Sequence, residues 1–444
     1  MTAVLAHGLG GSTDLPIPFT YALIGASWAL TVSFVVLAFA WRTPKLDPDN
    51  PGRRLPGWVT RFADAPATRN VLAATGVVFA VWVALAAFFG PSESSENALP
   101  GVFYVLLWVG LVAASLAFGP VWRVLSPVRT VHRSVCAAIG RSPAENDARY
   151  RNSWGYRPAV AGLFAFVWLE LASGDPGSVA AVRTWLLVYV VVTTAGAFLC
   201  GERWCERGDP FEVYSTLASR LSPLSRDRPS GRIVLRNPLD HLGSMPVRAG
   251  SVALMATLLG STAFDSFSAF PWWSRLVDGI GSPIGATLAR TAGVLVFVGF
   301  VGVSFWVASR ATGGLRPEQR AALPGQLSHS LIPIIIGYVF AHYLTYLVEK
   351  GQATVILLAD PMGRGWNPLG LGDAEVWYVL SEHPAASASI KVLFVLAGHV
   401  LGVIAAHDKS VRLLPRGHQL TGQLALLLTM VTYTFGGLYL LFGG

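Results

Sequence analysis

Ten long apolar segments constrain this chain more than any other feature. Each holds the roughly 17–25 mostly apolar residues that an α-helix needs to cross the hydrocarbon core of a bilayer. Of 444 residues, 53% are hydrophobic and 13% are charged, whereas soluble domains carry about 25% charged residues. The sequence therefore predicts one all-α membrane domain over residues 1–444, a polytopic helical bundle. Its ten predicted spans are 18–41, 69–90, 99–119, 158–175, 180–200, 247–264, 286–309, 328–349, 387–407 and 419–442.

The basic residues support an orientation for these spans. If the N-terminus lies outside and the spans alternate, all but six of the 33 Lys and Arg residues fall in inner loops. Such a bias is typical of cytoplasmic loops, so we predict a multi-pass plasma-membrane protein with both termini outside. The bias also accounts for the net charge of +8, because inner loops lie against anionic lipid. Aromatic residues do not interleave with the basic ones as in a nucleic-acid groove, so nucleic acid is not an expected partner.

Two inner segments, 120–140 and 209–223, have apolar residues at helical spacing with charges between them. This pattern predicts amphipathic helices lying in the inner membrane interface. Asp209 is well placed to cap the second of these helices, with Pro210 at its first position. The longer outer loops are predicted at about 265–285 and 350–386.

Two histidines lie inside predicted spans, where a titratable side chain is costly and usually functional. His342, Tyr346 and Glu349 are spaced i, i+4 and i+7, which places them on one helical face. By helical rise, His342 lies roughly 10 Å and His399 roughly 12 Å below the outer interface. The two imidazoles are therefore predicted to share one level in the outer half of the bilayer.

Three uses of this pair remain open: binding a metal, relaying protons, or ligating haem. Zinc, copper or iron would need more ligands, for which His7 and Glu349 are candidates. Haem ranks below a metal because the chain has no CxxCH motif, although bis-histidine ligation needs none. The alternative is that each histidine only bonds a backbone carbonyl or hydroxyl and packs the bundle.

Two acids within or at the end of predicted spans are the catalytic candidates. Glu170 is the only acid well inside the fourth predicted span, and Asp265 directly follows the sixth. Either would act as a further metal ligand or as a general base. The chain contains no Walker A motif and no H-E-x-x-H motif, which disfavours ATP-driven transport within this chain and zincin-type proteolysis.

Several short motifs are shared with a known group of proteins. They are HGLGGSTDLPIP near the N-terminus, GDPFEVYS at 208–215, AHY in the eighth span and GHVLGVIAAHD in the ninth. In these segments the chain resembles actinobacterial multi-pass membrane proteins labelled fenitrothion-hydrolase-like. The resemblance implies a bacterial plasma membrane and hydrolysis of an organophosphate ester.

Three functional hypotheses follow. The leading one is a metal-dependent hydrolase of an ester or phosphoester, in which His342 and His399 hold the metal at an outward-facing site. The alternative is a proton- or ion-coupled secondary transporter that uses His342, His399 and Glu170. The third is a membrane-anchor subunit that carries haem or docks a partner. The expected partners are the lipid bilayer and a small molecule or ion.

Overall fold

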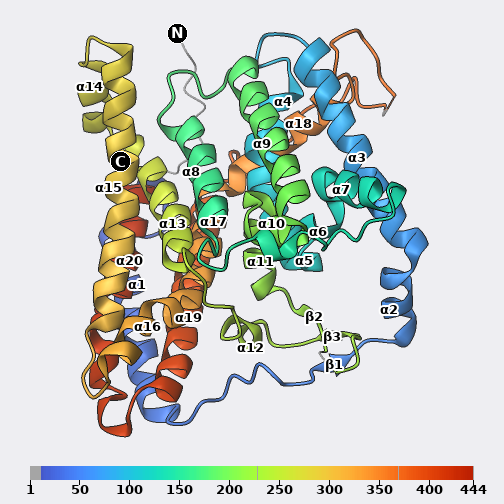
Figure 1. The fold of residues 1–444 in the computed structure, drawn as a ribbon. Coiled ribbons are helices and arrows are strands. Elements are labelled where there is room, and N and C mark those ends of the chain that lie inside the picture. The colour runs from blue at the N-terminus through green and yellow to red at the C-terminus, as the bar shows by residue number, and fades with distance from the viewer. Residues whose placement is uncertain (1–11, 228, 369, 444) are drawn as a thin grey trace.

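The computed structural model describes residues 12–227, 229–368 and 370–443 and shows a bundle of helices with one small sheet (Figure 1). Helix accounts for 72% of the residues, which confirms the predicted all-α class. Within the described residues, eight helices are long and apolar enough to cross a bilayer, or nine if one bent pair counts as a span. This supports a multi-pass membrane protein, whereas the predicted count of ten spans is not confirmed.

Most predicted spans coincide with helices to within a few residues, because their apolar runs are long and uninterrupted. These helices are α1 (Phe19–Ala40), α3 (Pro66–Phe89), α4 (Ala98–Gly101) continued by η2 (Val102–Gly110) and α5 (Leu111–Phe118), α9 (Val179–Cys200), α15 (Pro283–Arg310), α19 (Pro384–Leu413) and α20 (Leu424–Phe442).

Three predicted spans differ from the structure. Helix α8 (Arg157–Leu171) has only 15 residues, fewer than the roughly 17–25 of a full span. Helix α13 (Ser251–Ser268) bends by 83° into α14 (Pro271–Asp278), because Pro271 starts a new helix. The predicted span 328–349 is part of a helical run from 317 to 358, so the outer loop after it starts at residue 359. That run comprises α16 (Pro317–Leu327), η5 (Ser328–Ser330), α17 (Leu331–Thr345), η6 (Tyr346–Lys350) and α18 (Gly351–Leu358).

The predicted interfacial segment 209–223 forms a helix that packs inside the protein. Segment 120–140 keeps Val131, Val135 and Ile139 exposed, so its place in the membrane interface stays a prediction. Helix α11 (Pro210–Ala218) is buried along almost its whole length, whereas an interfacial helix would expose one face to lipid. Helix α6 (Trp122–Leu125) meets α3 at Gly76, where an added Cβ would lie 2.0 Å from the carbonyl oxygen of Leu125. Gly76 lies about 15 Å along α3 from its first residue, so α6 contacts the middle of that helix.

The remaining helices are α2 (Gly57–Asp64), α7 (Pro127–Ala138), α10 (Glu202–Arg207), α12 (Pro238–Leu242) and the short turns η1 (Ser12–Asp14), η3 (Asp147–Arg149), η4 (Ser219–Leu221), η7 (Arg416–His418) and η8 (Thr421–Gln423).

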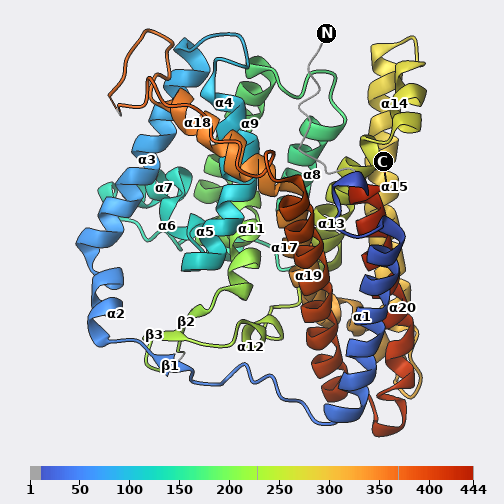
Figure 2. The same ribbon diagram turned by 180° about the vertical axis from the view of Figure 1, so that it is seen from behind.

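Three short strands, which the sequence did not predict, form an antiparallel sheet in the order β1-β3-β2. They are β1 (Arg53–Arg54), β2 (Leu224–Arg226) and β3 (Ile233–Leu235), and Arg53 pairs with Leu235. The sheet and α12 lie at the end of the bundle opposite α14 and α18 (Figure 2). The sheet therefore joins two loops that the sequence predicts to be on the same side of the membrane.

Helices α1, α19 and α20 pack together as one group. The carboxylate of Asp408 on α19 accepts hydrogen bonds from Trp41 Nε1 at 3.0 Å and from the backbone N–H groups of Lys45 and Leu46 at 2.6 and 3.1 Å. At the opposite end, the rings of Phe19 and Tyr439 lie 6.3 Å apart. The start of α1 and the end of α20 thus lie at one end of the bundle, and the side of the membrane that this end faces stays a prediction.

Helix α17 lies between α13 and α19 and is buried along nearly its whole length. It approaches α19 closely at two glycines, where an added Cβ on Gly337 would lie 2.5 Å from the carbonyl oxygen of Phe394 and 3.1 Å from Gly398 Cα. Small residues allow helices in a membrane to pack with their backbones close together. This packing fixes α17 and points the side chain of His342 at α13.

Candidate functional site

His342 of α17 is fully buried, and both of its ring nitrogens have hydrogen-bond partners on α13. Nε2 lies 2.8 Å from Asp265 Oδ2, and Nδ1 lies 3.0 Å from Ser266 Oγ. The hydroxyl of Tyr343 donates to the same Asp265 oxygen at 2.6 Å. Ser266 Oγ lies 2.9 Å from Tyr338 Oη. We call these five residues the His342 cluster.

The cluster can satisfy two protonation states of His342. An ionised Asp265 only accepts hydrogen bonds, so Nε2 carries a proton and donates to it. In the neutral ring, Nδ1 then accepts from the Ser266 hydroxyl. In the imidazolium, Nδ1 donates to Ser266, whose hydroxyl can donate in turn to Tyr338 or to the backbone oxygen of Thr262 at 3.4 Å. A proton can therefore be gained or lost without leaving a ring nitrogen unpaired.

Glu170 of α8 belongs to the same region of the bundle. Its charge acts on four tyrosines, and two of these, Tyr343 and Tyr346, are also acted on by Asp265. The other two are Tyr104 and Tyr214. The structure thus brings three sequence-predicted residues, His342, Asp265 and Glu170, into one electrostatic neighbourhood.

His399 and Glu349 do not join that neighbourhood through any hydrogen bond to its members. His399 is buried, Nδ1 bonds the carbonyl of Val395 at 2.8 Å, and Nε2 has no hydrogen-bond partner among the described residues. Glu349 accepts hydrogen bonds from the backbone N–H groups of Leu380 and Ser381 and from Ser381 Oγ, at 2.7–3.1 Å. Its carboxylate therefore anchors the loop 359–383 to the helix end.

The predicted metal site gains no support from this geometry. Within the described residues, no three His, Cys, Asp or Glu side chains converge so that they could hold a metal ion. His7, the fourth predicted ligand, lies outside the described residues. A metal or haem bound through His399 stays a prediction.

Sequence reasoning missed Ser266, Tyr338 and Tyr343 as members of the cluster. Tyr338 precedes His342 by one helical turn, so the i, i+4 spacing could have indicated it.

The π-helical turn η6 interrupts the helical face that the sequence predicts for His342, Tyr346 and Glu349. A π-helical turn holds more residues than an α-helical one, and Glu349 is therefore turned away from the direction that regular spacing predicts.

A second polar group surrounds α11, which is not one of the eight candidate spans. Asp209 caps the helix as predicted, accepting from Phe211 N at 3.0 Å, and also accepts from Tyr189 Oη and Trp122 Nε1. Glu212 forms a bidentate ion pair with Arg129, with distances of 2.7 and 3.0 Å. We call Arg129, Asp209 and Glu212 the α11 cluster.

The carboxylates of the α11 cluster are poorly hydrated. Burial, together with the nearby Glu212 carboxylate, raises the pKa of Asp209 to about 7. Burial also raises the pKa of Glu212, although the guanidinium groups of Arg129 and Arg123 oppose the shift. Asp209 is therefore a buried group that can exchange a proton near neutral pH.

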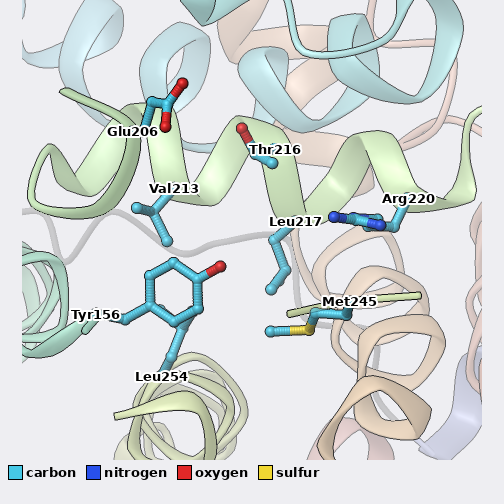
Figure 3. Close-up of a pocket in the computed structure, with 8 residues that line it drawn as sticks. All are labelled: Tyr156, Glu206, Val213, Thr216, Leu217, Arg220, Met245 and Leu254. Carbon is cyan, nitrogen blue, oxygen red and sulfur yellow. The ribbon is translucent and has the colours of Figure 1, made fainter. Parts of the chain in front are cut away.

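A small cavity lies between α11 and the start of α13 (Figure 3). Its volume is about 20 Å³, which is room for about one water molecule. Tyr156 and Leu254 face Val213 and Leu217 of α11 across it, as Figure 3 shows. The cavity is too small for an organic substrate, so we do not place a substrate there.

Comparison with known proteins adds no functional information. None of the protein families, curated proteins or solved structures compared with the chain matches it. The resemblance to fenitrothion-hydrolase-like proteins therefore stays a prediction.

Proposed function

We propose that the protein is a secondary transporter that exchanges protons for a cation at the His342 cluster. The observation that carries this proposal is the 2.8 Å pair between His342 Nε2 and Asp265 Oδ2, in which the side chains are 0% and 5% exposed. Ionisable side chains in the core of a membrane bundle are costly and typically mark proton or ion pathways. If the pair served only packing, apolar residues could replace it and would avoid the cost of burying ionisable groups.

The charge of the cluster suggests what it exchanges. With a protonated His342 and an ionised Asp265, the pair is neutral overall. Loss of one proton leaves the Asp265 charge uncompensated inside the bundle, with Glu170 nearby as a second acid. A cation entering the cluster would relieve this charge, so proton release and cation binding would be coupled.

Everted membrane vesicles test this proposal. A proton gradient, acid inside, is followed with a pH-sensitive dye while sodium, potassium or tetraphenylphosphonium chloride is added. We expect at least one cation to dissipate the gradient in the wild type. Asp265→Asn and His342→Gln should reduce that response to the level of vesicles lacking the protein. Asp278→Asn, which alters an exposed acid on α14, is the matched control and should behave as wild type. Equal responses in wild type and Asp265→Asn would refute the proposal.

A hydrolase is the second candidate, and Ser266 is the observation that favours it. The Ser266 hydroxyl, the His342 imidazole and the Asp265 carboxylate are linked in series, as in enzymes with an activated serine nucleophile. Ser266 is 0% exposed, so an ester could reach it only after the helices part. A fluorophosphonate probe tests this candidate, because it should label the wild type at Ser266 and leave Ser266→Ala unlabelled.

A further inference from the structure

Two fully buried aromatic residues lie between the His342 cluster and the α11 cluster. Trp108 of η2 is 1% exposed, Tyr214 of α11 is 0% exposed, and their rings stack with centroids 4.8 Å apart. Trp108 Nε1 and Tyr214 Oη have no hydrogen-bond partner among the described residues. Buried polar atoms in proteins are nearly always paired, commonly with internal water when the protein supplies no partner.

Each of these two residues lies near a residue of the candidate site. Glu170 is the charged group whose field acts on Tyr214. Trp108 lies beside the hydroxyl of Tyr343. Because the two rings stack, Glu170 and Tyr343 lie near the same aromatic pair. A water there could accept from the indole N–H, donate to the Glu170 carboxylate and bond the Tyr214 hydroxyl.

Tyr214 is also near the α11 cluster along the chain. It lies on the same short helix as Asp209, five residues along or about 7.5 Å of helical rise. Asp209 accepts a hydrogen bond from Tyr189 Oη at 3.1 Å. Ser215, the residue after Tyr214, lies 2.8 Å from Ser115 Oγ. Tyr214 and Asp209 thus lie at two levels of α11, with the carboxylate at the start of the helix.

We propose that Trp108, Glu170 and Tyr214 form a water-binding site that carries protons between the His342 cluster and Asp209. This inference rests on the proposed proton-coupled function. A proton released by His342 passes through bound water to the Glu170 carboxylate. The resulting carboxylic acid gives a proton to water at Tyr214, which delivers it to the Asp209 carboxylate. One proton leaves His342 and one reaches Asp209, and Glu170 returns to its ionised form.

The test measures cation-driven proton movement in the same everted vesicles with substitutions at the pathway. Tyr214→Phe and Glu170→Gln should slow proton movement at least about ten-fold, while the cation concentration giving half-maximal response stays unchanged. Tyr433→Phe is the matched control. That tyrosine is also in the bundle, but its hydroxyl bonds Ser304 at 2.6 Å, away from the pathway. It should leave the rate as in wild type.

The possible results separate the two proposals. If Asp265→Asn blocks proton movement and Tyr214→Phe does not slow it, the pathway is overturned and the proposed function stands. If wild type and Asp265→Asn do not differ, both fail. Thermal unfolding of purified Tyr214→Phe gives a readout independent of transport. The melting temperature should fall if the hydroxyl bonds an internal water. A rise in the melting temperature would show that the Tyr214 hydroxyl has no hydrogen-bond partner in the wild type, and it would overturn the water site.

Discussion

The ion pair between Arg129 and Glu212 supplies the sharpest stability prediction. Arg129 and Glu212 are 2% and 0% exposed, and their two hydrogen bonds measure 2.7 and 3.0 Å. Arg129→Met would leave the Glu212 carboxylate buried without its main counter-ion. Removing one member of a buried pair costs about 3–5 kcal/mol. Arg123 Nε remains 3.5 Å from Glu212 and offsets part of the loss, so we expect about 3 kcal/mol.

The matched control is Arg133→Met on the same helix. Arg133 pairs with Glu202 at 2.6 Å, but its side chain is 48% exposed, and exposed pairs contribute about 0–1 kcal/mol. The double variant Arg129→Met, Glu212→Gln removes both charges together. It should recover most of the stability lost by Arg129→Met alone, because neither charge is then left buried and unpaired.

Thermal unfolding of detergent-purified protein, followed by tryptophan fluorescence, gives the ranking of the variants. Steric trapping in lipid gives the unfolding free energies themselves. An unfolding free energy for Arg129→Met within about 1 kcal/mol of Arg133→Met would refute the reasoning. A double variant that is less stable than Arg129→Met would refute it as well, because the cost could not then come from an uncompensated charge.

Three further predictions concern stability and the outer loop. Because the folded state raises the pKa of Asp209 from 3.8 to about 7, it binds more protons than the unfolded state between these values. The unfolding free energy should therefore fall by up to about 4 kcal/mol between pH 4 and pH 7 and then level off. Unfolding measured over a pH series should show that Asp209→Asn lacks this fall. Gly398→Ala should lower the unfolding free energy by about 1–3 kcal/mol, since its Cβ would lie 2.6 Å from a backbone oxygen of α17, whereas Gly436→Ala, with open space around it, should not. Glu349→Gln should make the loop 359–383 more sensitive to limited proteolysis by weakening its anchor, and Glu375→Gln, an exposed change in the same loop, should have no effect; equal cleavage of the two variants would contradict the anchoring role.

The sequence predicts most of the long helices because a run of apolar residues fixes both the type and the length of a membrane helix. It fails at α13 and α14, where the pattern continues but Pro271 starts a new helix across an 83° bend. It also fails at α11. There the charges of Asp209 and Glu212 suggest a hydrated face. That face can be buried because partners from distant parts of the chain, such as Arg129, bind its carboxylates.

The members of the candidate site are partly predictable and their pairing is not. His342 and Asp265 stand out because each is a titratable residue within or next to an apolar run. Their contact depends on the rotation of α17 against α13, which is set by close packing at positions such as Gly337. Depth alone predicts a metal site that His342 shares with His399. Depth does not determine which way a side chain points around its helix.

The segment that follows α1 has a consequence for how the chain folds during synthesis. Its backbone is held by Asp408, which lies 363 residues beyond Lys45, and its strand β1 pairs with β3, whose Leu235 lies opposite Arg53. At about 5–20 residues per second, a ribosome needs on the order of 20–70 s to reach Asp408 after making Lys45. Throughout that interval the segment after the first span lacks its final partners. If residues 41–54 lie on the cytosolic side, as the charge bias predicts, chains stalled before α19 should expose them to cytosolic proteases and chaperones, and completed chains should not.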